Sequence, residues 1–178
     1  PAAERTLVAR CERPLPNGAA LRLIWGKGIA AASDPKVVTT VEQRFRYKVR
    51  AAFTADFSCE RERAAAPCLP IRPLTVRFSA PVARELAAQL RLRPAAGEPI
   101  APAFDKDDKS TEVSEVAFPK PLPESATFSV EMPASLRDLA GRPLANASAF
   151  PLKVQTGNAP PIAKFAAAPF GVVELNAD

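Results

Sequence analysis

The sequence lacks histidine altogether, and it has only one methionine, one tryptophan and one tyrosine among 178 residues. Without histidine there is no Ser–His–Asp or Cys–His catalysis, and the commonest general base is missing. The GxSxG elbow of hydrolases and the GxxxxGK[ST] phosphate loop are also absent, and the Gly-Lys-Gly at 26–28 is typical of a tight turn. These absences predict a chain that is not an enzyme and binds no cofactor.

Long hydrophobic runs are missing too. No stretch reaches the ~18 apolar residues that would span a bilayer, and no signal peptide is visible. Nucleic-acid binding is not expected, because one Trp and one Tyr form no aromatic series for stacking bases. The formal net charge of +5 and the pI near 9.4 instead permit association with acidic surfaces or anionic lipid.

Acidic residues do not form a recognisable metal or catalytic motif. Asp105, Asp107 and Asp108 have the spacing of a calcium loop, but its glycine and its distal glutamate are absent. Glu60 and Glu62 lie in a charged loop, where a catalytic carboxylate pair is not expected. We therefore predict no metal ligands.

Cysteine usage indicates the compartment. Cys59 and Cys68 flank the charged loop ERERAAAP between two strand-like runs, which suits a disulfide that clamps a hairpin. Closing a loop of this size stabilises a chain by ~2.5–3 kcal/mol on the chain-entropy model. The alternative is two free thiols in a reducing cytosol, whereas zinc would need more ligands. A disulfide predicts the periplasm or the exterior, and the odd Cys11 is expected to find its partner outside this chain.

Twenty prolines divide the chain into short pieces, and most pieces alternate apolar and polar residues. Such alternation is typical of half-buried antiparallel strands, and short strands between turn residues predict an all-β sandwich. Strands are predicted at 19–25, 42–50, 74–78, 90–92, 113–118, 127–132 and 150–155, and short helices at 82–89 and 134–140. The predicted core comprises Val76, Phe78, Leu92, Val116, Phe128, Val130, Leu139, Phe150, Leu152 and Val154.

A stripe of cations accompanies the strand at 42–50. Alternate residues place four cations on the face opposite its aromatic side chains. A solvated outer face that discourages edge-to-edge aggregation explains such a stripe, and a docking surface for an acidic partner domain is the alternative. The candidate interaction residues are Arg44, Arg46, Lys48 and Arg50.

The sequence also repeats itself over a long spacing. RPLPNGAALRLIW at 13–25 matches KPLPESATFSVEM at 120–132, and with a small slip 45–49 matches 150–154. Self-similarity of this kind indicates tandem modules of one fold. The first copy lacks the long lead-in of the second, so we expect the chain to be a piece of a larger multidomain protein.

Three segments are therefore predicted. They are a partial β module at 1–56, a β-sandwich at 57–157, and at 158–178 a Pro-rich linker with the start of a further module. The partial module would be the C-terminal half of a fold like that of the sandwich. Its strands at 19–25 and 42–50 would then need another layer to cover their apolar face.

About half of the chain resembles a bacterial Ig-like domain of the S-layer and adhesin type. The resemblance lies in PLTVRFSAPVARELAAQLRL at 73–92 and in the segment from 121 to the Thr-Gly at 156–157. It implies an Ig-like antiparallel sandwich, in which Asp138 and Gly141 have only a structural meaning, as a turn between strands. The residues that carry it are Val76, Phe78, Ser79, Pro81, Val82, Leu122, Val130, Leu136, Asp138, Gly141, Leu144, Thr156 and Gly157.

Nearly the whole chain, from RPLPNGAALRLIWGKGI to PPIAKFAAAPFGVVE, is similar to the N-terminal region of large bacterial alpha-2-macroglobulin-like proteins. This resemblance implies a periplasmic or cell-envelope location and an interaction module that precedes a protease trap. The family's thioester motif Cys-x-Glu-Gln is absent, since Cys59 precedes Glu-Arg and Cys68 precedes Leu-Pro. No bait region is recognisable, so no functional residue of the family can be assigned to this chain.

Two functions follow from these resemblances. The first is a non-catalytic structural or interaction domain of an alpha-2-macroglobulin-like protease inhibitor. The second is an Ig-like module of an adhesin or S-layer protein that binds a protein or a glycan. The expected partners are other domains of the same larger chain and, through the full-length protein, target proteases. Neither nucleic acid nor a direct membrane span is expected.

Overall fold

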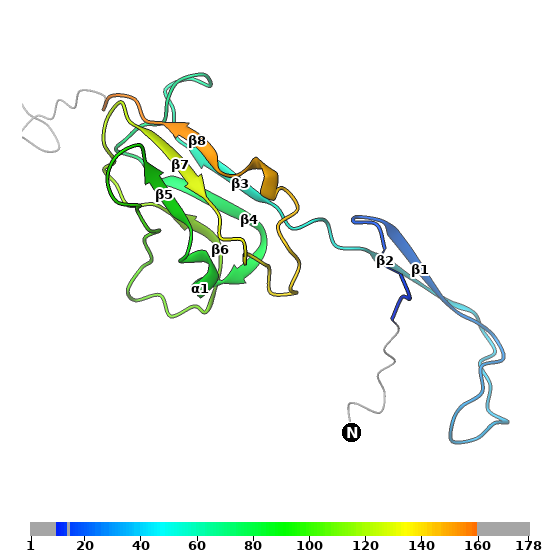
Figure 1. The fold of residues 1–178 in the computed structure, drawn as a ribbon. Coiled ribbons are helices and arrows are strands. Elements are labelled where there is room, and N and C mark those ends of the chain that lie inside the picture. The colour runs from blue at the N-terminus through cyan, green and yellow to red at the C-terminus, as the bar shows by residue number, and fades with distance from the viewer. Residues whose placement is uncertain (1–9, 14, 160–178) are drawn as a thin grey trace, which may run out of the picture. The chain divides into compact units, whose positions relative to one another are not determined.

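The computed structural model describes residues 10–13 and 15–159 (Figure 1). The chain divides into two units, Pro1–Phe53 and Thr54–Asp178, a division close to the boundary predicted between residues 56 and 57. The described part of the first unit is a β-hairpin, and that of the second is a β-sandwich. Most of the predicted linker and next module, from residue 160 onward, lies outside the described residues, as do residues 1–9 and 14 of the partial module.

The hairpin consists of β1 (Ala20–Trp25) and β2 (Gln43–Lys48), which pair in antiparallel fashion. Both strands fall where alternation predicted them. The long connection between them is held near its base by Thr39. Its hydroxyl donates a hydrogen bond to the Gly26 carbonyl (2.7 Å) and accepts one from the Ile29 amide (3.0 Å).

Two three-stranded antiparallel sheets form the sandwich (Figure 1). One has the order β3-β4-β6 and the other the order β5-β7-β8. The all-β fold predicted from the sequence is thereby confirmed. The strands are β3 (Ala55–Cys59), β4 (Leu74–Ala83), β5 (Arg91–Pro94), β6 (Glu112–Ala117), β7 (Thr127–Glu131) and β8 (Leu152–Gln155).

Most of the predicted core is buried. Seven of its ten residues are fully enclosed: Val76, Phe78, Leu92, Val116, Phe128, Val130 and Val154. Phe150 and Leu152 are only half-buried. The prediction for Leu139 was wrong, because 56% of this residue is exposed. Its place in the core is taken by Leu136, which is 2% exposed.

The two predicted helices differ from the structure. The first is reduced to α1 (Arg84–Ala87), since Val82 and Ala83 continue β4 and pair with β6. The second was wrong, because residues 134–140 form turns on either side of two short β-bridges. A 3₁₀ helix that no pattern indicated, η2 (Ala147–Ala149), precedes β8.

A buried carboxylate builds the turn that replaces the second helix. The Asp138 carboxylate accepts hydrogen bonds from the amides of Ala140 (3.0 Å) and Arg142 (2.8 Å) and from the Arg142 guanidinium (2.6 Å). Gly141 supplies the positive φ of 75° that the turn requires. This local network outcompetes helix formation, in the way that Asp side chains generally favour turns, and it directs Leu139 outward.

The predicted disulfide joins Cys59, the last residue of β3, to Cys68, with 5.6 Å between their Cα atoms. Cys68 in turn lies beside the end of β8. Its amide donates to the Gln155 carbonyl (2.8 Å), and its carbonyl accepts from the Gly157 amide (2.9 Å). The bridge therefore ties a strand of one sheet to a strand of the other at the same end of the sandwich.

Other strand edges of the sandwich are covered as well. At β3 the Asn146 side chain takes the place of a neighbouring strand. Its Oδ1 accepts from the Ala55 amide (3.1 Å), and its Nδ2 donates to the Ala55 carbonyl (2.8 Å). Short bridges by Ile100 and Ala103 accompany β5 and β6. Each of these covers blocks strand pairing at the residues that it contacts.

We expect Phe128→Ala to destabilise the sandwich by about 3–5 kcal/mol, because it removes a fully buried ring and leaves a cavity. Urea unfolding followed by circular dichroism measures the loss. Leu139→Ala is the matched control. It should change the free energy of unfolding by less than about 0.5 kcal/mol, since its side chain is largely exposed. Equal costs for the two variants would contradict the packing.

Acid sensitivity should depend on Asp138. Burial raises the pKa of this carboxyl, but hydrogen bonds and charge from Arg142 outweigh burial and hold the pKa below its ordinary value of 3.8. Because this pKa is lower in the folded state than in the unfolded state, the ionised carboxylate stabilises the fold. The stabilisation is complete when the pH is above the unfolded-state pKa, and it is lost as the pH falls through the folded-state pKa.

We therefore expect Asp138→Asn to cost about 1.5–3 kcal/mol at neutral pH and much less at about pH 2. Urea unfolding across this range would measure it. Some acid sensitivity should remain, because hydrogen bonds and charge from Arg93 also lower the pKa of Glu131. A cost that does not change with pH would show that the charge of Asp138 is not what stabilises the turn.

Candidate functional site

The β1–β2 hairpin has two chemically different faces. On one face Leu21 lies opposite Tyr47 and Leu23 lies opposite Phe45. On the other face Arg22 lies opposite Arg46, and the neighbouring cross-strand pairs also contain cations. Side chains of successive residues leave a strand on opposite sides, so the alternation of the sequence creates this division directly. We call the two surfaces the apolar face and the cationic face.

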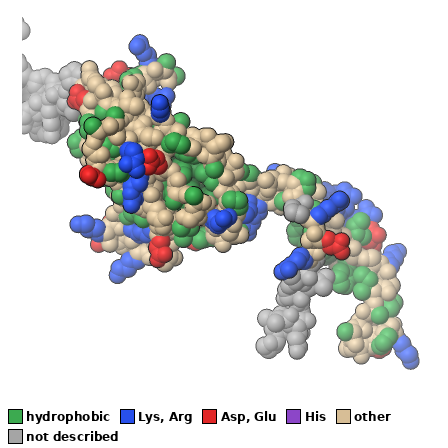
Figure 2. Space-filling view, viewed as in Figure 1, with side chains coloured by type: hydrophobic (Ala, Val, Ile, Leu, Met, Phe, Trp, Pro, Cys, Tyr) green, Lys and Arg blue, Asp and Glu red, His purple; other side chains and the backbone are tan. Residues whose placement is uncertain are grey.

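The apolar face is uncovered. Phe45 and Tyr47 are 40% and 53% exposed. Eight of the nine large hydrophobic residues that are exposed in the described part of the chain lie within residues 21–47, and three of them, Leu21, Phe45 and Tyr47, lie on this face. Exposed apolar residues concentrated in one segment are typical of an interaction surface. Figure 2 shows apolar and basic side chains together at the surface of the hairpin.

An equivalent pair of strands within the sandwich shows what such a face normally contacts. The sequence repeat sets β1 against β7 and residues 45–49 against 150–154, a span that overlaps β8. The strands β7 and β8 also pair in antiparallel fashion, with a register shifted by two residues from that of β1 and β2. In that pair Phe128, Val130 and Val154 are buried beneath the facing sheet. Their counterparts in the repeat are Leu21, Leu23 and Val49, which have the same alternation but are only half-buried or exposed.

Positive charge is concentrated in the same unit. Residues 1–53 contain ten Lys and Arg against four Asp and Glu, a formal charge of +6, whereas residues 54–178 contain 14 against 15, a charge of −1. The excess charge of the whole chain thus comes from the hairpin unit. Among the described ion pairs only one, between Arg44 and Glu42 (2.5 Å), involves a cation of the hairpin.

The structure places Arg44, Arg46 and Lys48 on the cationic face of β2, as alternation predicted. Arg50 lies beyond the end of the strand, where its carbonyl accepts a hydrogen bond from the Gly18 amide (3.3 Å). Sequence reasoning missed Arg22 on β1, which extends the cationic face. Its alternation with Leu21 and Leu23 was visible, but its position opposite Arg46 depends on the register of the hairpin.

The acidic loop at 105–109 is organised around an arginine. The Arg84 guanidinium donates to the backbone carbonyls of Asp105 (3.0 Å), Asp108 and Ser110 (3.2 Å), and it lies 4.8 Å from the centroid of the Phe104 ring. A cation of the protein itself thus occupies the carbonyl cluster of this loop. In the described part of the chain, no three Cys, Asp or Glu side chains come together as metal ligands.

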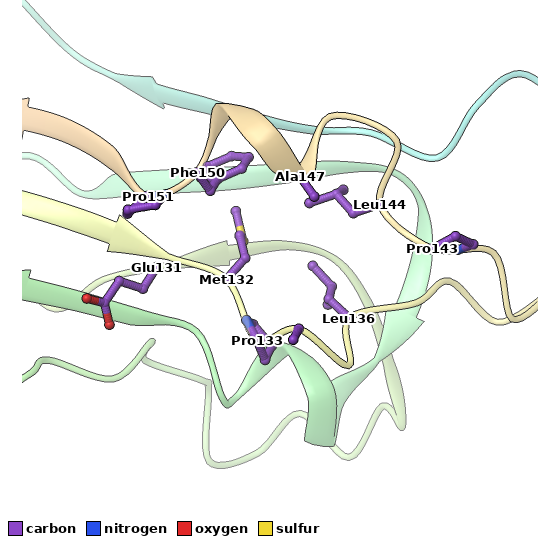
Figure 3. Close-up of a pocket in the computed structure, with 10 residues that line it drawn as sticks. Glu131, Met132, Pro133, Leu136, Pro143, Leu144, Ala147, Phe150 and Pro151 are labelled. Atoms are coloured by element: carbon purple, nitrogen blue, oxygen red, sulfur yellow. The ribbon is translucent and has the colours of Figure 1, made fainter.

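A hollow of about 480 Å³ lies where the chain leaves β7 (Figure 3). Met132 and Leu136 point into it, toward Phe150. Its one charged lining residue, Glu131, is held by Arg93 through hydrogen bonds of 2.7 and 3.1 Å. With an apolar lining and its only carboxylate engaged, this hollow offers no acid–base pair.

The remaining cysteine, Cys11, is free and exposed. No helix in the described residues is long and apolar enough to cross a bilayer. Comparison of the chain with protein-family models, curated proteins and solved structures finds no match. The hairpin, with its uncovered apolar face and its unit's excess of positive charge, is therefore the strongest candidate for a functional surface.

Replacing one of two opposed arginines should stabilise the hairpin. Arg22 and Arg46 lie directly opposite each other, and like charges at such positions repel. We expect Arg46→Glu to turn this repulsion into attraction worth roughly 0.2–1 kcal/mol. Amide hydrogen exchange of β1 and β2 would slow accordingly. Faster exchange in this variant would contradict the register of the two strands.

Proposed function

We propose that this chain is a non-catalytic interaction module of the cell envelope, part of a larger alpha-2-macroglobulin-like protease inhibitor. In this role the sandwich is a self-contained folded unit, and the hairpin is the surface through which the module joins other domains of the same larger chain. The observation that carries the proposal is the contrast between β7–β8, whose apolar face is buried, and β1–β2, whose equivalent face is exposed.

Burial of apolar surface explains why such a hairpin needs a partner. Each large apolar side chain contributes about 1.5–3 kcal/mol when it is fully removed from water. A two-stranded hairpin in water is marginally stable by itself. A further β layer would bury the apolar side chains of Leu21, Leu23, Phe45 and Tyr47, as the facing sheet does in the sandwich. The cations on the opposite face would stay in water.

The disulfide supports the proposed location. A bridge between Cys59 and Cys68 persists in oxidising compartments and is rare in a reducing cytosol. The periplasm or the cell surface fits this chemistry.

A second function remains a candidate, an Ig-like module of an adhesin or S-layer protein. The same all-β sandwich and the open hollow beside β7 would suit a protein or glycan ligand. Saturable binding of this chain to one class of glycan on an array would favour the second function. A thioester motif and a bait region downstream in the parent sequence would favour the first.

An interaction module should neither trap a protease nor take up an amine. We expect the purified chain to incorporate no labelled methylamine and to give no stoichiometric protection of a large substrate from a panel of proteases. Mass spectrometry and substrate cleavage measure the two outcomes. An intact thioester-containing inhibitor serves as the positive control. Covalent amine uptake by this chain would overturn the proposal.

A further inference from the structure

The outer edge of β2 has backbone groups without a described partner. The Val49 amide donates to the Ala19 carbonyl (2.8 Å), which fixes these two residues as a hydrogen-bonded pair. In an antiparallel ladder such pairs alternate, so Tyr47 and Phe45 bond to β1, while the amides and carbonyls of the residues between them point away from it. Those outward groups belong to Arg44, Arg46 and Lys48.

The equivalent edge in the sandwich is covered at one end. There, β7 is the central strand and β8 the edge strand, and Cys68 covers the end of β8 through two hydrogen bonds. If β1 and β2 correspond to β7 and β8, a completed sheet would add its next strand beside β1. The edge of β2 would then still be open, and no described residue covers it as Cys68 covers β8.

The cations along β2 also restrict which strand could pair with this edge. The residues whose amides point outward are the same residues that bear the cations, and Arg22 opposes Arg46 across the hairpin. Two copies of this edge would repel each other, which is how basic residues normally prevent edge pairing. A strand with acidic residues at matching positions would instead form opposite-charge cross-strand pairs.

From this placement we infer that the free edge of β2 accepts an extended segment of a partner polypeptide that alternates acidic and apolar residues. Its backbone continues the hydrogen-bond ladder, its acidic side chains lie beside Arg44, Arg46 and Lys48, and its apolar side chains extend the face formed by Phe45 and Tyr47. Strand addition of this kind takes affinity from the main chain and specificity from alternate side chains. The inference rests on the proposed function, because it names the partner of the same hairpin.

A pair of synthetic peptides tests the inference on the complete chain. One is fluorescein-labelled (Glu-Val)₄, and the other is the same peptide N-methylated on alternate residues along the edge that would face β2. Methylation keeps the charges and side chains but removes the backbone donors. We expect the first peptide to bind and the second to bind at least about tenfold more weakly. Anisotropy titration measures both.

Amide exchange read by NMR locates the binding. Bound (Glu-Val)₄ should slow exchange at Arg44, Arg46 and Lys48, while Phe45 and Tyr47 should change little because they already bond to β1. Arg46→Glu should weaken binding roughly fivefold even though the hairpin itself becomes more stable. Lys153→Glu, the same charge change at an exposed position of β8, is the control and should leave affinity unchanged.

Three outcomes would overturn the inference. Equal affinity for the methylated peptide would mean adsorption by charge alone. Binding to vesicles of phosphatidylglycerol but not to (Glu-Val)₄ would identify an anionic lipid surface as the partner. Absence of binding to either probe would exclude an acidic strand. None of these affects the proposed function, which fails instead through amine uptake or protease trapping.

Discussion

Every sheet in the described part of the chain has one mainly apolar face, and the need to remove that face from water determines the rest of the structure. In the sandwich the faces of two sheets cover each other, so Val76, Phe128 and Val130 are almost completely buried. In the hairpin the same alternation is present, and Phe45 and Tyr47 are exposed. One pattern therefore yields a self-contained domain in one place and an interaction surface in the other.

Alternation predicted every described strand except β3 (Ala55–Cys59), because a strand's period of two is a property of the backbone itself. It also predicted the stripe at Arg44, Arg46 and Lys48. The repeat went further, since it equated β1–β2 with β7–β8 before any pairing was known. What it could not supply was the register between strands, and for this reason Arg22 was missed as a member of the cationic face.

The errors came from segments whose conformation depends on local side-chain chemistry. Residues 134–140 have a helix-like composition. The Asp138 carboxylate, however, accepts hydrogen bonds from two backbone amides, and the segment forms a turn instead. The orientation of Leu139 follows from that turn and not from periodicity. Similarly, α1 is shorter than predicted because β6 offers Val82 and Ala83 a partner, and a contact so distant in sequence leaves no local pattern.

The two units also differ in how the edges of their sheets are protected. The sandwich covers part of its edges with specific groups, an Asn146 amide at the start of β3 and the disulfide-linked Cys68 at the end of β8. The hairpin instead carries cations along β2. A charged edge repels copies of itself, yet it leaves every outward amide and carbonyl available to a strand of opposite charge. A disulfide-linked loop blocks strand pairing at the residues that it covers, whereas a charged edge disfavours like-charged strands and selects a complementary one.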